Sequence, residues 1–149
     1  FFKKGKNIMR IIYFYRVGNL FYRKNVPILP KICDVLIRLF CNSVVYSSTK
    51  IGKNCTFAYG GIATVVHPKT VIGNNVTISQ CVTIGGRSGF KELPIIEDNV
   101  YIGAGAKVLG PITIGANSII GANAVVINNV DENKIVAGIH AKVIKNIKE

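Results

Sequence analysis

An apolar residue recurs at every sixth position through the middle of the chain. The series is Val66, Ile72, Ile78, Ile84, Phe90, Ile96, Ile102, Val108, Ile114, Ile120 and Val126. Neither an α-helix, with 3.6 residues per turn, nor a single strand, with a period of two, produces this spacing. A six-residue period instead predicts a parallel β-helix, in which each hexad is a short strand followed by a corner. Branched side chains suit the flat inner walls of such coils.

Three hexads are expected to make one triangular coil, so that equivalent residues stack 18 positions apart. On that count Val66, Ile84, Ile102 and Ile120 should lie one over another. An ordinary β-sandwich of short strands is the alternative, but its strands would not keep one phase over ten hexads. The pattern therefore predicts an all-β protein built on a left-handed parallel β-helix, preceded by a short helical region.

Two segments depart from the regular repeat. Three surplus residues precede Val66, so we expect a bulge within residues 58–64. Residues 85–94 (GGRSGFKELP) keep the six-residue phase but place Ser88 and Pro94 where small apolar residues are expected. We expect this segment to be partly extruded as a loop. Loops that leave a regular scaffold commonly carry function.

The residues before the repeats show helical periodicity. Apolar residues fall on one face of residues 7–22, which predicts a first helix. Pro30 suits the first turn of a second helix over residues 30–42. The apolar stripe of this second helix is predicted to be Ile32, Val35, Leu36, Leu39 and Phe40.

The chain is thus divided into a helical segment 1–43, a β-helix 44–145 and a short tail 146–149. Its formal net charge is +12, and residues 1–43 hold nine basic residues against one acidic residue, Asp34. Such an excess favours anionic lipid, nucleic acid or small phosphate-bearing molecules. The basic residues form no nucleic-acid-binding motif, so no nucleic-acid partner is predicted.

The four cysteines do not have the spacing of a zinc site and are predicted to be free thiols of a cytoplasmic protein. No apolar run approaches the roughly 18 residues of a membrane span. A peripheral contact with the inner face of a membrane, through the basic N-terminal helices, is an expected partner interaction.

Three stretches carry a resemblance to a known family. They are VTISQCVTIGG (76–86), PIIEDNVYIGAGAKVLGPITIGANSIIGANAVV (94–126) and AGIHAKVI (137–144). In this order they resemble the hexapeptide-repeat acyltransferases, and within them the serine acetyltransferase-like branch. The resemblance implies a left-handed β-helix, a homotrimer, and acetyl-CoA bound in a groove between neighbouring subunits. It also implies transfer of the acetyl group to a hydroxyl without a covalent enzyme intermediate.

Cofactor contacts follow from the same motifs. The resemblance implies that backbone groups at Ala104 and Ala122 bind the pantetheine arm, and that a basic residue, here Lys142, meets a CoA phosphate. Gly85 and Gly86 match the glycine pair before the loop. Gly103 precedes Ala104 and is a further candidate, since glycine lets a ligand approach the backbone closely. The alternative for these small residues is simple packing at a corner, and no metal is expected.

The catalytic positions of the resembled branch are not matched here. That branch uses an Asp–His pair on successive coils and a second His in the loop. The corresponding residues in this chain are Val44, Tyr59 and Leu93. Only two histidines are present, His67 and His140.

A general base for hydroxyl attack needs a group that titrates near neutral pH, which histidine supplies. Counting by 18 from His67 places it in one corner column with Gly85, Gly103 and Gly121. We therefore take His67 as the candidate base and Tyr59 as a second polar group. Hydrogen bonding of the His67 ring to the backbone is the alternative. Arg87 and Lys91 in the loop are candidates for CoA phosphate or acceptor contact.

These features predict an acetyl-CoA-dependent O-acetyltransferase. The acceptor is expected to be a small molecule or glycan, in the first place a sugar in surface-polysaccharide biosynthesis, since only about 43 residues precede the coils. Serine O-acetyltransferase is one alternative, and a catalytically impaired, structural β-helix trimer is another. A γ-type carbonic anhydrase would need three metal-binding histidines, and the chain has two.

Overall fold

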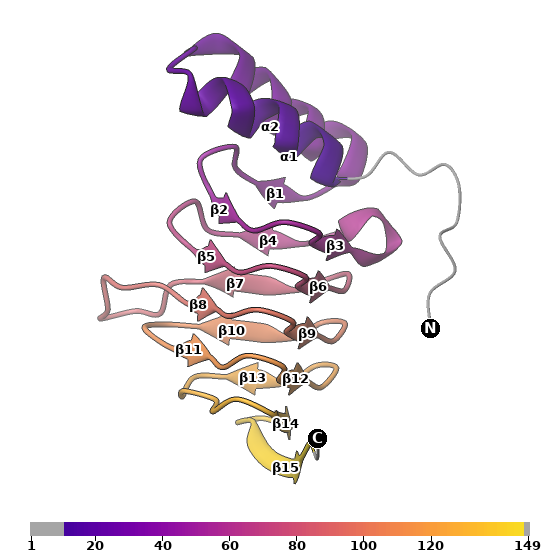
Figure 1. Ribbon diagram of the computed structural model, residues 1–149, viewed down its shortest axis with the longest axis vertical. Coiled ribbons are helices and arrows are strands. Elements are labelled where there is room, and N and C mark those ends of the chain that lie inside the picture. The colour runs from indigo at the N-terminus through magenta and orange to yellow at the C-terminus, as the bar shows by residue number, and fades with distance from the viewer. Residues whose placement is uncertain (1–10, 148–149) are drawn as a thin grey trace.

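The computed structural model describes residues 11–147. Two helices, α1 (Ile11–Arg23) and α2 (Ile28–Cys41), precede a stack of short strands (Figure 1). The strands are β1 (Val44–Val45), β2 (Lys50–Ile51), β3 (Thr56–Phe57), β4 (Val65–Val66), β5 (Val71–Ile72), β6 (Thr77–Ile78), β7 (Thr83–Gly85), β8 (Ile95–Ile96), β9 (Tyr101–Ile102), β10 (Lys107–Leu109), β11 (Thr113–Ile114), β12 (Ile119–Ile120), β13 (Val125–Val126), β14 (Lys134–Ala137) and β15 (Lys142–Asn146). A 3₁₀ turn, η1, covers Ala58–Gly61.

The strands form three walls around one core, which confirms the predicted left-handed β-helix. Sheet A holds β1, β4, β7, β10 and β13, sheet B holds β2, β5, β8 and β11, and sheet C holds β3, β6, β9, β12, β14 and β15. Each coil passes through A, B and C in turn, and neighbouring coils pair in parallel except for the final pair, β14 and β15.

Apolar side chains, nearly all of them β-branched, stack along each wall because the pairing keeps them in register. The stack of sheet A is Val45, Val66, Ile84, Val108 and Val126; that of sheet B is Ile51, Ile72, Ile96 and Ile114; that of sheet C is Phe57, Ile78, Ile102, Ile120 and Val136. All are buried in one hydrophobic core.

The expected stack of Val66, Ile84, Ile102 and Ile120 is confirmed for its first pair and its last pair, but the link between Ile84 and Ile102 is wrong. Ile84 pairs with Val108, 24 residues later, and Ile102 lies on sheet C. The cause is the segment 86–94, which leaves the wall as a loop and removes one hexad from the coil. Its apolar member, Phe90, is exposed instead of buried. The predicted extrusion of this loop is thus confirmed, and its effect on the register was not anticipated.

The second predicted irregularity is also present. The surplus before β4 forms η1, and Val44 pairs with Val65, 21 residues later. The η1 loop is tied to the chain beneath it, because the Ser43 hydroxyl donates to the Gly61 carbonyl (2.6 Å) and accepts from the Thr64 amide (3.3 Å).

Asparagines line the corner between sheets B and C. Asn75, Asn99, Asn117 and Asn133 all have φ between 56° and 59°, a left-handed conformation that asparagine tolerates. Their side chains form a ladder in which each amide donates to the next oxygen, at 3.1, 3.0 and 3.1 Å. Asparagine therefore fits this corner both through its backbone and through its side chain.

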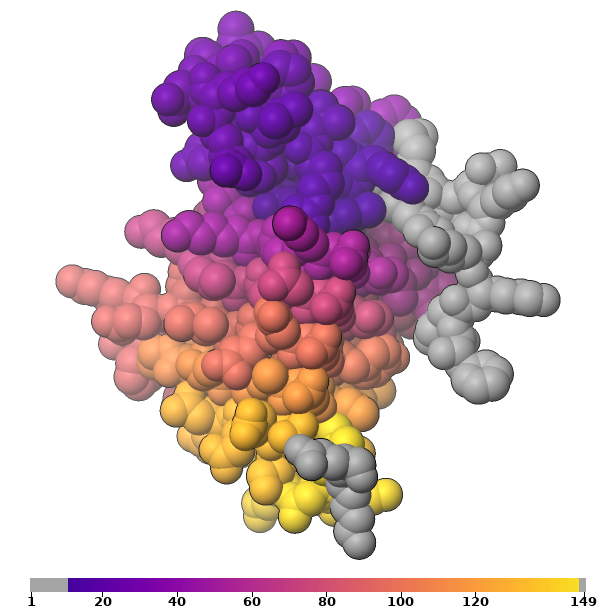
Figure 2. Space-filling model, viewed as in Figure 1, coloured from indigo at the N-terminus to yellow at the C-terminus, as the bar shows by residue number. Residues whose placement is uncertain are grey.

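The two helices cover the first coil (Figures 1 and 2). Ile11, Tyr15 and Gly18 are the buried residues of α1. The Tyr15 hydroxyl donates a hydrogen bond to the Thr49 carbonyl (2.6 Å) and accepts one from the Ile51 amide (3.1 Å). The predicted helix over 7–22 agrees with α1 from Ile11 onward; its first four residues lie outside the described residues.

Helix α2 is present, but its predicted apolar stripe is wrong. The buried residues are Pro30, Cys33, Ile37 and Cys41, while Ile32, Val35, Leu39 and Phe40 are exposed. Helix α2 is apolar on nearly every side, so hydrophobicity alone could not select the buried face. The small cysteines face the coil, and larger aliphatic residues face away from it. None of the four cysteines, which all lie within residues 11–147, forms a disulfide, and three of them are buried.

Candidate active site

The predicted site residues lie along the two edges of sheet A. We call these edges the A–B corner, where the chain passes from sheet A to sheet B, and the C–A corner, where it passes from sheet C to sheet A. His67 and Gly86 directly follow strands of sheet A, Gly85 is the last residue of one, and all three belong to the A–B corner. Tyr59, Gly103, Ala104 and Ala122 follow strands of sheet C and belong to the C–A corner. One chain does not bring the two groups together.

The column around His67 differs from the one counted by 18. Gly85 does lie beside His67, because the His67 amide donates to the Ile84 carbonyl (2.9 Å). The next residue along the corner is Leu109, which pairs with Gly85. Gly103 and Gly121 are on the other edge, so their expected place in this column is wrong. The extruded loop, which shifts the register by one hexad, is the reason.

The His67 ring is half-buried and touches its own backbone turn. Its Nδ1 atom accepts a hydrogen bond from the Lys69 amide at 3.2 Å. A neutral imidazole that accepts at Nδ1 carries its proton on Nε2. In this arrangement Nε2–H can donate to a developing oxyanion. Removing a proton from a hydroxyl requires the ring to turn away from Lys69, which breaks one long hydrogen bond.

Gly85 and Gly86 border open space. A Cβ atom built on Gly85 has no neighbour within 4 Å, and one on Gly86 meets only the Leu93 side chain, at 3.4 Å. The coil therefore does not require glycine at Gly85 for packing. Beyond it, the Arg87 guanidinium lies 5.5 Å from the centre of the Phe90 ring. The start of the loop is therefore lined by two glycines that leave open space, followed by the basic side chain of Arg87.

The C–A corner carries a column of small residues. A Cβ atom on Gly103 would lie 2.7 Å from the Ala122 nitrogen, and one on Gly121 would lie 2.9 Å from the Ala137 Cβ. Close contact between successive coils therefore requires glycine at Gly103 and restricts Gly121. Ala122 is exposed beside this column.

Lys142 lies further along the same edge. It starts β15, where it pairs with Ala137, and its side chain is exposed. The C–A corner therefore carries a row of small residues with the Lys142 ammonium at its far end. This arrangement fits the pantetheine arm and a phosphate of CoA, since backbone amides and a nearby ammonium are what those groups bind.

Tyr59 projects from the η1 loop at this edge. Its φ of 53° is unusual for an aromatic residue, and its side chain is 58% exposed. The adjacent Gly60 and Gly61 also have positive φ. The loop therefore holds the phenol out from the coil instead of packing it inside.

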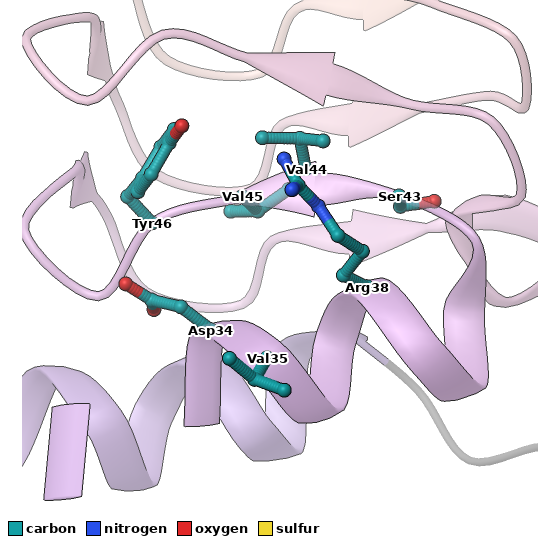
Figure 3. A pocket seen from close by; sticks show the side chains of 7 residues that line it. All are labelled: Asp34, Val35, Arg38, Ser43, Val44, Val45 and Tyr46. Carbon is teal, nitrogen blue, oxygen red and sulfur yellow. The ribbon is translucent and has the colours of Figure 1, made fainter. Parts of the chain in front are cut away.

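A hollow of about 190 Å³ lies between α2 and β1, along the first strand of sheet A (Figure 3). One end reaches Ser43, which holds the η1 loop of Tyr59. The other end reaches Tyr46, which lies beside His67 because the preceding residues Val45 and Val66 pair. The hollow thus connects the two edges that carry the predicted catalytic residues.

Two charged side chains of α2 line this hollow, and sequence reasoning did not assign either of them to the site. The Arg38 guanidinium reaches toward β1 beside Val44, while the Asp34 carboxylate lies toward Tyr46 (Figure 3). Asp34 accepts from the Ser47 amide (2.7 Å) and hydroxyl (2.5 Å). Arg38 has no hydrogen-bond or ion-pair partner within residues 11–147. Asp34 and Arg38 line the same hollow because α2 packs over β1, and that packing is visible only in three dimensions.

No group of three or more His, Cys, Asp and Glu side chains within residues 11–147 could hold a metal ion. Neither α1 nor α2 has the length and hydropathy needed to cross a bilayer.

Residues 94–128 match the family described as bacterial transferase hexapeptide (six repeats). The chain is 38% identical, over 136 residues, to the serine acetyltransferase of Staphylococcus xylosus, covering 90% of this chain and 62% of that protein. It is 34% identical, over 138 residues, to the serine acetyltransferase of Bacillus subtilis, covering 91% and 63%. The chain therefore spans less than two thirds of the relatives that it matches.

Solved structures give the same picture. A serine acetyltransferase in complex with CoA superposes with a TM-score of 0.82 at 34% identity, covering 90% of this chain and 55% of that one. The Brucella abortus serine acetyltransferase in complex with coenzyme A gives a TM-score of 0.86 at 28% identity, covering 92% and 55%.

Proposed function

We propose that this chain, a member of the bacterial hexapeptide-repeat transferases, is an O-acetyltransferase that uses acetyl-CoA. The observation that carries the proposal is its likeness to a CoA-bound serine acetyltransferase, at 34% identity and a TM-score of 0.82. The chain spans 55% of that structure. The activity, the acceptor and the assembly are therefore each proposed below from the residues of this chain.

The C–A corner is the proposed site of the pantetheine arm. Ala104 and Ala122 offer backbone groups beside the small column of Gly103, and Lys142 lies further along the same edge, where a phosphate can be reached. Gly85 and Gly86 leave open space at the opposite edge of sheet A, where the acetyl end can approach without meeting a side chain.

We further propose a homotrimer, because the two groups of residues lie on different edges of one chain. A neighbouring copy that places its C–A corner against the A–B corner of the first would complete the site. Mixing two inactive variants tests this arrangement. His67→Ala alters one edge and Ala122→Tyr the other. In randomly mixed trimers about a quarter of the interfaces combine two unaltered edges, so about a quarter of the activity should return.

Both variants must assemble for the mixture to be informative, and size-exclusion chromatography checks this first. A mixture of two assembled variants that stays inactive would contradict a site shared between subunits. A mixture of wild type with itself, taken through the same dissociation and reassembly, is the control for losses in handling.

Serine is the acceptor that we propose. The relatives named serine acetyltransferase favour it over the sugar acceptor expected first from the sequence. The hollow on β1 supports the same choice, because it carries a carboxylate from Asp34 and a guanidinium from Arg38. These groups complement the ammonium and carboxylate of an amino acid. A neutral sugar would leave Arg38 without a partner.

The proposed reaction is direct transfer. The acceptor hydroxyl oxygen attacks the thioester carbonyl carbon, the C–O bond forms, the C–S bond breaks, and the hydroxyl proton ends on the CoA sulfur. His67 is proposed to move that proton after its ring turns away from the Lys69 amide. The Tyr59 hydroxyl is proposed to contact the acceptor from the opposite edge.

A sugar acceptor stays the second candidate, because Val44 and Leu93 are apolar where the resembled branch has catalytic side chains. Loss of the thioester absorbance, followed with serine, with sugars and without acceptor, distinguishes the two. We expect loss that depends on serine, and Arg38→Gln should raise the KM for serine. Loss that depends on a sugar alone would replace serine by that sugar. Binding of acetyl-CoA without transfer to either would favour an impaired, structural β-helix.

A further inference from the structure

The outer face of the helical layer is apolar, although nothing in the described chain covers it. Seven residues make up this face: Tyr13, Val17 and Leu20 of α1, and Ile28, Ile32, Val35 and Leu39 of α2. Their exposed fractions run from 47% to 67%. We call this surface the apolar end face.

Helical spacing sets the direction of this face. Ile28, Ile32, Val35 and Leu39 follow one another by three or four residues and so lie on one side of α2. The buried Cys33, Ile37 and Cys41 lie on the side that packs on the first coil. Helix α1 has the same division, with Ile11 and Tyr15 toward the coil. The apolar end face therefore points away from the coils. The two helices that carry it lie at the end of the stack (Figures 1 and 2).

Three exposed cations gather at one edge of this face, around the turn between α1 and α2. Arg23, Lys24 and Lys31 are exposed at the ends of the helices that meet there. The only acid in residues 11–42 is Asp34, whose carboxylate is turned toward Ser47. An apolar centre with a basic edge is the pattern of helices that lie in the plane of an anionic bilayer.

We propose that the apolar end face docks the protein on an anionic membrane surface, with the two helices lying in the interface and the coils pointing away from it. A bilayer with anionic headgroups supplies both the apolar medium for the seven side chains and the negative charge for the cations. A second copy seated face to face would supply apolar side chains but no helical acid for Arg23, Lys24 and Lys31, because Asp34 accepts from Ser47. The proposal concerns where the protein binds and does not depend on the acetyl transfer proposed above.

Sedimentation with lipid vesicles tests this docking on the full chain. Vesicles that contain phosphatidylglycerol are compared with vesicles of phosphatidylcholine alone. We expect binding to the anionic vesicles that weakens as salt is added, because added ions screen charges at the surface. The double variant Ile28→Gln and Leu39→Gln should reduce the partition coefficient by at least about tenfold, since two apolar side chains are lost from the bilayer.

A matched control comes from the opposite end of the molecule. Ile144 in β15 is 65% exposed, like Ile28 and Leu39 at 67%. The change Ile144→Gln should leave vesicle binding unchanged. All three positions are well exposed, so the variants should fold, and thermal unfolding of each verifies this. Residues 1–10 are the same in every variant, so their charges cannot produce the difference.

Three results would overturn the proposal. One is an absence of binding to anionic vesicles. Another is binding that the α2 double variant does not change. The third is a helix-dependent self-association, seen by analytical ultracentrifugation as a larger species that the double variant abolishes, because a second copy would then occupy the face. Acetyl transfer is measured without vesicles and is a separate readout. A failure of membrane binding would therefore not contradict the proposed acetyl transfer, and a failure of acetyl transfer would not contradict membrane binding.

Discussion

Two glycines that look alike in the sequence should respond in opposite ways to the same substitution. Gly85 and Gly103 each follow a branched residue of the hexad series. In Gly103→Ala the new Cβ would lie 2.7 Å from the Ala122 nitrogen, 2.8 Å from the Ile120 oxygen and 2.9 Å from the Gly121 carbonyl carbon. All three atoms are backbone of the next coil, which cannot turn aside as a flexible side chain could.

The cost follows from that geometry. Relieving the overlap must separate two coils locally and lengthen the 2.8 Å hydrogen bond from the Gly103 amide to the Ile120 carbonyl. Overpacking of this kind lowers the free energy of unfolding by about 1–3 kcal/mol. In Gly85→Ala the new Cβ meets nothing within 4 Å, and φ at Gly85 is not positive. Alanine there should leave stability unchanged or raise it by up to about 1 kcal/mol, because the unfolded chain loses freedom.

Urea unfolding followed by far-ultraviolet circular dichroism measures both changes, and acetyl-CoA kinetics add a second readout. If the acetyl end approaches Gly85, the added methyl group occupies its space, so the KM for acetyl-CoA should rise while stability does not fall. Equal stability of Gly103→Ala and the wild type would refute the packing explanation of the column. An unchanged KM in Gly85→Ala would remove Gly85 from the cofactor site.

Two further predictions concern the helix–coil junction and a corner of the coil. Tyr15→Phe removes a buried hydroxyl that bridges the Thr49 carbonyl and the Ile51 amide, so the free energy of unfolding should fall by about 1–3 kcal/mol; an unchanged urea midpoint would contradict this. Hydrogen bonds from the backbone amide of Asn74, and then from its side chain, lower the pKa of Asp98. Its stabilisation is therefore present above the unfolded pKa of about 3.9 and is lost as the pH falls through the folded value. Asp98→Asn should flatten the decline of stability at acid pH, and a parallel decline in both proteins would count against it.

The walls of the fold could be predicted because a hexad repeat constrains every inward position. The register could not. A loop that removes six residues leaves the numerical phase intact, so Ile84 and Ile102 looked like neighbours although Ile84 pairs with Val108. The chemistry of residues 86–94 indicated a loop, but not how many residues the coil would skip. That single shift also separated His67 from Gly103.

The helices show a different limit. Hydrophobic periodicity finds a buried face only when the other faces are polar, and α2 is apolar on nearly all of them. The stripe of larger residues was the natural choice, yet Cys33 and Cys41 pack on the coil. The same limit hid the hollow of Asp34 and Arg38, since their position depends on how α2 crosses β1. Motifs located Ala104 and Ala122 on one edge because these residues belong to uninterrupted coils, and Lys142 lies beside that edge because β15 folds back antiparallel on β14.

Acceptor-dependent thioester loss in His67→Ala, with His140→Ala as the matched control, is the decisive test of the proposed chemistry. His140 is the only other histidine in the chain. If His67 moves the proton, the rate with serine should fall about 100-fold or more in His67→Ala, with unchanged affinity for acetyl-CoA and a near wild-type rate in His140→Ala. A wild-type rate in His67→Ala would contradict this role for His67. A wild type that binds acetyl-CoA but transfers to no acceptor would contradict the proposed activity itself.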